Sequence, residues 1–213
     1  MHFLPENIDL YAHQFTQKES ELLAKLNRDT QIKMVNPRML SGHLQGRFLS
    51  MISHLKLPKI ILEIGTYTGY SALCLAEGLN KDGKLITIDI NEEIAHFAQQ
   101  FINQSDYKHQ IELMVGDATK IIPNLPHSFD LVFIDADKEN YSIYFDLIID
   151  KVPTNGLILV DNVLWNGHIL KPESEMDLDT KSIHQFNLKV HNDPRVENIL
   201  VPIRDGLMML RKK

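Results

Sequence analysis

Acidic and amide side chains follow two apolar segments in the second half of the chain. The run Leu131 to Ile134 ends in Asp135, and the run Leu157 to Val160 ends in Asp161 and Asn162. If these runs are neighbouring strands of a parallel sheet, their carboxyl ends share one edge and the three side chains can converge. Two carboxylates and an amide oxygen form a hard ligand set that suits Mg²⁺, Mn²⁺ or Ca²⁺ and not zinc. The alternative is that each aspartate only caps a following helix or turn.

A second candidate site begins at a turn between an apolar strand and the helix that follows it. The turn reads GTYTGYS from Gly65 to Ser71, contains Thr66 and Gly69, and is preceded by Glu63. Its glycines allow a ligand to approach the backbone closely. Two glycines four residues apart are also common in turns that bind nothing.

An acidic residue, Asp89, ends the next predicted strand, 24 residues after Gly65. Such a residue can accept hydrogen bonds from both hydroxyls of a ribose. The turn lacks the G-x-G-x-x-G spacing that brings a pyrophosphate to a helix N-terminus, so a nucleoside without phosphates fits better. S-adenosylmethionine is such a ligand, with Glu63 for its ammonium, Ser71 for its carboxylate and Asp89 for its ribose. Asp117 could reach the adenine from the same edge, or could only cap a helix.

The elements that must position these residues alternate along the chain after Pro58. Short apolar runs, each followed by a more polar stretch of helical length, are typical of a parallel sheet with crossover helices. The predicted strands are Lys59 to Ile64, Lys84 to Ile88, Ile111 to Val115, Leu131 to Ile134 and Leu157 to Val160. The predicted helices are Tyr70 to Leu79, Glu92 to Asn103, Ala118 to Ile122, Asn140 to Asp150 and Thr180 to Val190. A predicted antiparallel hairpin closes the chain, with strands Val196 to Pro202 and Leu207 to Leu210.

The first 57 residues are predicted to be helical. Apolar residues recur at helical spacing in Glu19 to Leu26 and in His43 to Leu55, and Ser41 is placed to cap the second segment. The segment Asn166 to Asp179 is the least regular part of the chain. We expect it to be a surface loop over whatever the edge of the sheet binds.

Composition limits the classes of protein to which the chain can belong. It has 213 residues, of which 44% are hydrophobic, which is enough for the core of one α/β domain and excludes disorder. Its net charge of −6 argues against a nucleic-acid clamp held by electrostatics. The single cysteine, Cys74, cannot form an intramolecular disulfide, and no apolar run reaches the roughly 20 residues that span a bilayer. We therefore expect a cytoplasmic protein without a membrane partner.

Several segments together resemble the cation-dependent class I O-methyltransferases, the group of catechol and caffeoyl-CoA methyltransferases and their bacterial relatives. In chain order they read EIGTYTGYS from Glu63, TIDI from Thr87, GDA from Gly116, FIDADKENY from Phe133, DNVLWNG from Asp161 and PIRDGL from Pro202. The resemblance runs from about Met39 to the end of the chain. The chain departs from the family at Asn155-Gly156, where relatives usually have Gly-Gly, and at Arg204, where Gly is frequent.

The resemblance implies a fold and an assembly. It implies a single methyltransferase domain over residues 1–213, with an N-terminal helical segment at 1–57 and a Rossmann-like core at 58–213. The α/β core would be a doubly wound, seven-stranded sheet, mostly parallel with one antiparallel strand and with helices on both faces. Family members are commonly homodimers, so a homodimer is expected.

The resemblance also implies roles for individual residues. S-adenosylmethionine would be bound by Ser41, Glu63, Gly65, Thr66, Gly69, Ser71, Asp89, Asp117, Ala118, Asp135 and Asp137. The divalent cation would be held by Asp135, Asp161 and Asn162. Asn166 would face the acceptor, and Trp165 either walls the acceptor pocket or packs under the loop.

The expected reaction is methyl transfer from S-adenosylmethionine to a hydroxyl of a small aromatic diol whose oxygens lie on the cation. Coordination lowers the pKa of a bound hydroxyl, so that a phenolate can form near neutral pH. Lys138, three residues after Asp135, can take or stabilise the departing proton. Asp135 and Lys138 are thus the expected catalytic residues, although Lys138 could instead be an exposed surface lysine.

Three other functions stay open. Some bacterial relatives methylate a hydroxylated uridine in tRNA, and the net acidity of this chain weighs only mildly against that activity. A nicotinamide-dependent dehydrogenase could use a similar sheet, but the G-x-G-x-x-G spacing is missing. A non-catalytic module could retain the cofactor pocket, but it would not need Asp135, Lys138, Asp161 and Asn162.

Overall fold

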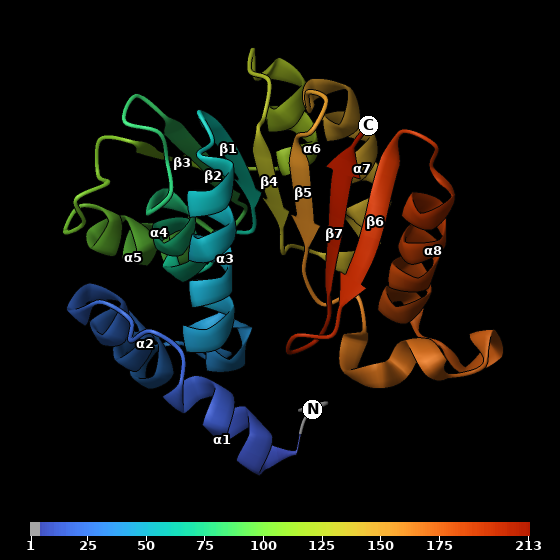
Figure 1. Ribbon diagram of the computed structural model, residues 1–213, viewed down its shortest axis with the longest axis horizontal. Coiled ribbons are helices and arrows are strands. Elements are labelled where there is room, and N and C mark those ends of the chain that lie inside the picture. The colour runs from blue at the N-terminus through green and yellow to red at the C-terminus, as the bar shows by residue number, and fades with distance from the viewer. Residues whose placement is uncertain (1–4) are drawn as a thin grey trace. The chain divides into compact units, whose positions relative to one another are not determined.

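Seven strands and the helices between them make up residues 5–213, the part of the chain that the computed structural model describes (Figure 1). The strand order is β3-β2-β1-β4-β5-β7-β6. The chain divides into two units, one ending at Asp117 and the other beginning at Ala118.

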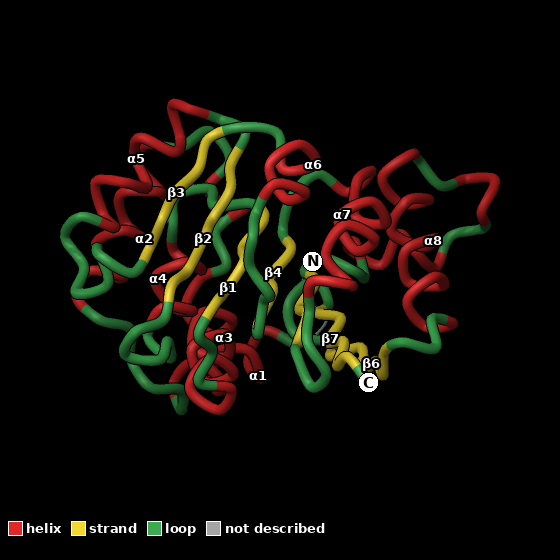
Figure 2. Tube along the Cα trace, turned by 90° about the horizontal axis from the view of Figure 1, so that it is seen from above, coloured by secondary structure: helices red, strands yellow, loops and turns green. Residues whose placement is uncertain are grey.

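The first unit contains three parallel strands, β1 (Ile60–Ile64), β2 (Lys84–Asp89) and β3 (Ile111–Val115). β2 lies between the other two, and its register places Thr87 opposite Glu63 of β1. The helices α4 (Tyr70–Ala76) and α5 (Glu92–Ile102) follow β1 and β2 as crossovers, and Figure 2 shows these three strands with helices beside them. Side chains of β1 and β2 are buried over most of their length, which explains why most of their residues are apolar.

The N-terminal part of this unit is helical, as predicted, with α1 (Glu6–Gln14), α2 (Glu21–Lys33) and α3 (Gly42–Lys56). Ser20 caps α2 by accepting a hydrogen bond from the backbone N–H of Leu23. The prediction that Ser41 caps α3 is wrong. A capping residue has an extended backbone, whereas Ser41 is already helical (φ −56°, ψ −39°) and its side chain makes no capping hydrogen bond.

Helices α3 and α4 pack closely because small residues lie where they meet. A Cβ atom at Gly46 of α3 would lie 2.6 Å from the Tyr70 ring and 2.9 Å from the sulfur of Cys74. Cys74 is fully buried, and burial raises the pKa of its thiol to about 12, so it fills space in the core as an inert group.

The second unit contains β4 (Leu131–Ile134), β5 (Leu157–Val160), β6 (Val196–Val201) and β7 (Leu207–Lys212). β4 and β5 are parallel, and β7 runs antiparallel to both β5 and β6, so β7 is the one reversed strand. The predicted C-terminal hairpin is confirmed. The helices are α6 (Ala118–Ile121), α7 (Tyr141–Ile148) and α8 (Leu178–Asn192).

Irregular segments of the second unit differ in part from expectation. The expected loop 166–179 contains two short 3₁₀ turns, η5 (Trp165–Leu170) and η6 (Glu173–Glu175), and α8 already begins at Leu178. Asn155 and Arg204, which stand where relatives usually or often have glycine, both have positive φ, 65° and 48°. Positive φ is the reason that glycine suits these positions, and asparagine tolerates it better than most residues.

Within residues 5–213, the structure contains no helix that is both long enough and apolar enough to cross a membrane.

We expect Gly78→Ala to lower the free energy of unfolding by about 3 kcal/mol, because the packed backbone of α3 cannot yield. A Cβ atom at Gly78 would lie 2.2 Å from backbone atoms of Ser53 and His54. Gly42→Ala is the matched control, since it meets no atom within 4 Å and adds only the strain of φ 73°, about 1 kcal/mol. Urea denaturation measures both, and equal losses would contradict the close packing at Gly78.

Candidate functional site

A chain of hydroxyl groups orients the carboxylate of Glu63 near the end of β1. Glu63 is fully buried, at 0% exposed. The Thr87 hydroxyl donates to Glu63 Oε2 at 2.5 Å, and Thr66 Oγ1 lies 2.5 Å from Thr87 Oγ1. A hydroxyl has one proton, so Thr66 must be the donor to Thr87. The predicted residues Glu63 and Thr66 are therefore brought together, through a threonine that the sequence analysis did not select.

The turn after β1 is held against the end of β2 by Asp89. Its Oδ2 accepts from the backbone N–H of Tyr67 at 2.7 Å, and its Oδ1 accepts from the N–H of Asn91 at 2.9 Å. Gly65 and Gly69 have φ of 99° and 89°, values that favour glycine. The predicted glycines are thus required by the backbone, and they bring the turn to the carboxylate of Asp89.

The remaining predicted residues of the first unit lie on its helices and loops. Ser41 is buried at the start of α3, and Ser71 is buried in α4. Asp117 is partly buried and directly precedes α6, whose first residue, Ala118, is buried and belongs to the second unit.

In the second unit, the ammonium of Lys138 is surrounded by oxygen atoms. Its Nζ donates to Asp135 Oδ1 at 3.2 Å, to Asn162 Oδ1 at 2.7 Å and to the Tyr141 hydroxyl at 2.6 Å. These bonds use all three donors of the ammonium. Lys138 is only 8% exposed, so the alternative of a free surface lysine is wrong. Two predicted cation ligands, Asp135 and Asn162, therefore converge on one positive charge.

The third predicted ligand, Asp161, is buried beside this group. Its carboxylate accepts from the backbone N–H of Asn162 at 2.8 Å, and its carbonyl oxygen accepts from the Tyr141 hydroxyl at 3.0 Å. Complete burial, followed by the negative charges of Asp135 and Asp161, raises the pKa of Tyr141 well above its usual value. The phenol therefore stays protonated.

Asp137, one residue before Lys138, accepts its own set of hydrogen bonds. Its Oδ1 accepts from the Tyr144 hydroxyl and its Oδ2 accepts from the Asn140 amide, both at 2.5 Å. The residues that fix Asp137 thus come from α7 and from the 3₁₀ turn before it, η3 (Lys138–Asn140).

The two residues assigned to the acceptor lie in the turn η5. The Trp165 ring centroid lies 5.6 Å from Lys138 Nζ, which is within cation–π range. Asn166 is exposed, and its backbone N–H donates to the Asp205 carboxylate at 2.5 Å. Trp165 therefore lies beside the Lys138 group, whereas Asn166 is fixed through its backbone and leaves its side chain near solvent.

The donor set around Lys138 fits a hard divalent cation. Asp135 and Asn162 already share a positive group, the lysine ammonium, which stands in for a bound cation. Carboxylate and amide oxygens are the atoms that Mg²⁺, Mn²⁺ and Ca²⁺ prefer. Across residues 5–213, no group of three His, Cys, Asp or Glu side chains is arranged to hold a metal. The predicted set contains only two carboxylates and depends on the amide of Asn162.

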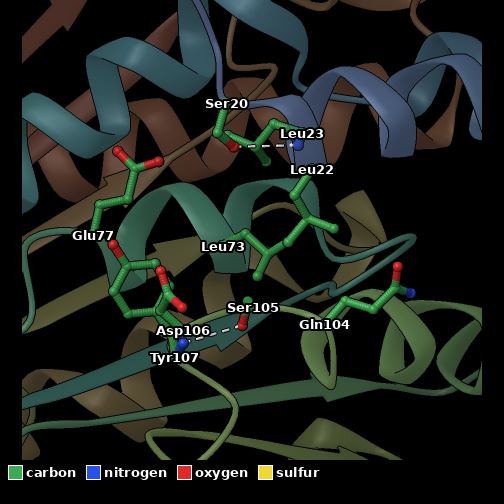
Figure 3. A pocket seen from close by; sticks show the side chains of 9 residues that line it. All are labelled: Ser20, Leu22, Leu23, Leu73, Glu77, Gln104, Ser105, Asp106 and Tyr107. Carbon is green, nitrogen blue, oxygen red and sulfur yellow. Dashed lines mark hydrogen bonds between the residues drawn. The ribbon is translucent and has the colours of Figure 1, made fainter.

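A pocket of about 200 Å³ lies elsewhere in the first unit (Figure 3). Its lining consists of Ser20, Leu22, Leu23, Leu73, Glu77, Gln104, Ser105, Asp106 and Tyr107. None of these lining residues belongs to the predicted sites. One of its two acids, Glu77, is paired with Arg47 through two hydrogen bonds of 2.8 Å.

Thr87→Val should lower the free energy of unfolding by about 1.5–3 kcal/mol, because it leaves the buried Glu63 carboxyl and the Thr66 hydroxyl without their shared partner. Thr68→Val is the matched control: the buried Thr68 hydroxyl accepts only from the neutral hydroxyl of Thr30, at 3.1 Å. Its loss should cost about 1 kcal/mol. Chemical denaturation of both variants measures the difference, and a Thr87→Val loss no larger than the control would contradict the ordering role of Thr87.

The chain has relatives among known O-methyltransferases. A model of the O-methyltransferase family matches residues 13–213. Caffeoyl-CoA O-methyltransferase 5 of Nicotiana tabacum is 36% identical over 179 residues, covering 79% of this chain and 75% of that protein.

Two solved structures share the fold. The SAH-bound methyltransferase PaMTH1 of Podospora anserina superposes with a TM-score of 0.91 and 26% identity, covering 99% of this chain and 98% of the other. An O-methyltransferase of Bacillus cereus in complex with SAH gives a TM-score of 0.89 and 26% identity, covering 97% of each chain. The predicted Rossmann-like, seven-stranded, mostly parallel fold is confirmed. On the family match and this likeness, the chain belongs to the O-methyltransferase family.

Proposed function

We propose that this protein transfers the methyl group of S-adenosylmethionine to a hydroxyl oxygen of a small aromatic diol, with the help of a divalent cation. The observation that carries the proposal is the convergence of Asp135 and Asn162 on the buried ammonium of Lys138, with the Asp161 carboxylate beside them. Hard oxygen ligands around one positive charge suit a divalent cation. Such a cation can also bind the two neighbouring oxygen atoms of a diol acceptor.

S-adenosylmethionine as the methyl donor is supported by the first unit. Buried Glu63 offers an acceptor for the ammonium of the methionine part, and Asp89 offers one for the ribose hydroxyls. SAH, which is bound in both structural neighbours, is the product left when S-adenosylmethionine gives up its methyl group. The other proposed cofactor residues are Ser41, Gly65, Thr66, Gly69, Ser71, Asp117, Ala118, Asp135 and Asp137.

Asp135, Asp161 and Asn162 would hold the cation, and Mg²⁺ is the first candidate because it binds through few protein oxygens and keeps open positions. When bound, the cation would supply a Lewis acid that lowers the pKa of an acceptor hydroxyl. As an ammonium that donates to three oxygen atoms, Lys138 would stabilise the negative oxygen left by the departing proton, and as a neutral amine it would take that proton. In the balanced reaction the S–CH₃ bond breaks as the O–CH₃ bond forms, SAH leaves, and the hydroxyl proton passes to the neutral amine of Lys138 or to solvent.

The acceptor is proposed to be a catechol-like ring, as in a hydroxycinnamoyl thioester. The support comes from the relative in Nicotiana tabacum, whose name specifies caffeoyl-CoA, and from Trp165, whose ring lies beside Lys138 and could wall an aromatic acceptor. The turns η5 and η6, which separate β5 from α8, are the segments in which specificity would reside.

We also propose that the chain forms a homodimer through α1. This helix buries none of its residues, and Leu10, Tyr11 and Phe15 at its C-terminal end are each more than 60% exposed. Apolar side chains gathered in this way are typical of a surface that another molecule covers, and a second copy of the chain is the proposed partner.

The main test of function is methyl transfer from labelled S-adenosylmethionine to caffeoyl-CoA, simple catechols and hydroxylated tRNA, each with and without EDTA. We expect the diols to be methylated, the tRNA to be left unmodified, and EDTA to abolish turnover until Mg²⁺ is added back. Asp161→Asn should lower turnover at least about a hundredfold, since one charged ligand is lost.

Glu139→Gln is the matched control, because Glu139 is an exposed acid next to Lys138. It should retain wild-type turnover. Full activity of Asp161→Asn in EDTA would remove the cation from the mechanism, and methylation of tRNA alone would replace the proposed acceptor.

Light scattering tests the dimer. The wild-type protein should have about twice the chain mass of 24.5 kDa, and Tyr11→Ser with Phe15→Ser should return it to the monomer mass. Leu188→Ser, which changes a half-exposed apolar residue on α8, should leave the mass unchanged. A wild-type mass of one chain at micromolar concentration would contradict the proposal.

A further inference from the structure

Tyr141, the first residue of α7, joins the catalytic lysine to the end of β5. Its side chain is completely buried, at 0% exposed. Its hydroxyl makes two hydrogen bonds, at 2.6 Å to Lys138 Nζ and at 3.0 Å to the carbonyl oxygen of Asp161. A phenol has one proton, and a carbonyl oxygen can only accept. The proton therefore points to Asp161, and a lone pair of the phenol oxygen is left facing the ammonium.

The phenol ring has little freedom to turn away from this arrangement. The Tyr141 ring meets the ring of Phe186 from α8 edge-on, with centroids 5.6 Å apart and an interplanar angle of 78°. Lys138 Nζ also lies 4.9 Å from the centroid of the Tyr141 ring. Since packing fixes the ring and Asp161 fixes the proton, the hydroxyl oxygen is a preorganised acceptor for Lys138.

This hydrogen bond differs in kind from the other two that Lys138 Nζ donates. Asp135 and Asn162 are proposed cation ligands, so each would share its oxygen atoms between the lysine and the cation. The Tyr141 oxygen is not among the proposed ligands. Its hydrogen bond with the ammonium can therefore stay unchanged whatever Asp135 and Asn162 bind.

We propose that Tyr141 is a positioning residue that fixes Lys138 Nζ for proton handling during methyl transfer. The inference rests on the proposed function, in which Lys138 stabilises or takes the acceptor proton. A positioning error of about 1 Å can cost an enzyme up to about a hundredfold in rate. The alternative is that Tyr141 only fills the core between α7 and α8, in which case its hydroxyl is dispensable for the reaction.

Tyr141→Phe tests the proposal, since it keeps the ring and removes only the hydroxyl. With caffeoyl-CoA as the acceptor and Mg²⁺ present, we expect kcat to fall between about ten- and a hundredfold. The dissociation constant for S-adenosylmethionine, measured by calorimetry, should change less than twofold. Tyr144→Phe is the matched variant, because Tyr144 lies one turn later on α7 and donates to Asp137 instead. It should weaken S-adenosylmethionine binding more than it lowers kcat.

A double-mutant cycle separates positioning from packing. If Tyr141 acts through Lys138, adding Tyr141→Phe to Lys138→Met should lower kcat no further than Lys138→Met alone. A purely structural loss would be additive. 4-Aminophenylalanine at position 141 serves if Tyr141→Phe fails to fold, because an aniline still donates to the Asp161 carbonyl but is a poor acceptor for an ammonium.

The outcomes distinguish this inference from the function on which it rests. Wild-type kcat in Lys138→Met would overturn the proposed role of the lysine itself. An impaired Lys138→Met together with wild-type kcat in Tyr141→Phe, or with additive losses in the double variant, would overturn the positioning role of Tyr141 and leave the proposed function in place.

Discussion

The ammonium of Lys138 is held by oxygen atoms from three separate segments, and this interaction organises the second unit. Asp135 follows β4, Asn162 follows β5, and Tyr141 begins α7. Each would be an ordinary polar residue if it were considered alone. Because β4 and β5 are parallel neighbours, their carboxyl ends meet at one edge, and the oxygen atoms that follow them face a common point. Such a point needs a positive charge, since Asp161 beside it is buried and an unpaired buried carboxylate is costly.

The same physical rule orders the first unit. The carboxylate of Glu63 is completely buried, and the hydroxyls of Thr87 and Thr66 orient it. Asp89 is fixed by backbone N–H groups from two loops. Polar atoms are therefore held in place before any ligand arrives, which reduces the entropy lost on binding. Both units thus use rigid strand ends to aim side chains, and they leave variation to the loops.

Most of the fold could be predicted because strands that are buried on both faces of a parallel sheet appear in the sequence as short apolar runs. β3, β4 and β5 begin and end at the predicted residues, since each apolar run is bounded by polar or glycine residues. Ser41 shows the limit of such reasoning, because a capping residue is defined by its backbone conformation and not by its type alone.

The partners of the site residues were harder to predict than the site residues themselves. Thr87 is read as one more β-branched strand residue until the register places it opposite Glu63. From the sequence, Tyr141 is predicted only to pack in the core. The position of Asp161 in the structure shows that the Tyr141 hydroxyl also donates a hydrogen bond to its carbonyl oxygen. Lys138 could be proposed from its spacing to Asp135, but its burial depends on α7 and η5, which the local sequence does not describe.

The central claim is that Asp135, Asp161 and Asn162 form one cation site, and anomalous scattering from a crystal grown with Mn²⁺ tests it most directly. We expect a single anomalous peak bounded by oxygen atoms of all three side chains, at about the 2.0–2.2 Å that small hard cations require. An absence of any peak at these residues, with Lys138 Nζ still bonded to both Asp135 and Asn162 in the presence of excess Mn²⁺, would contradict it.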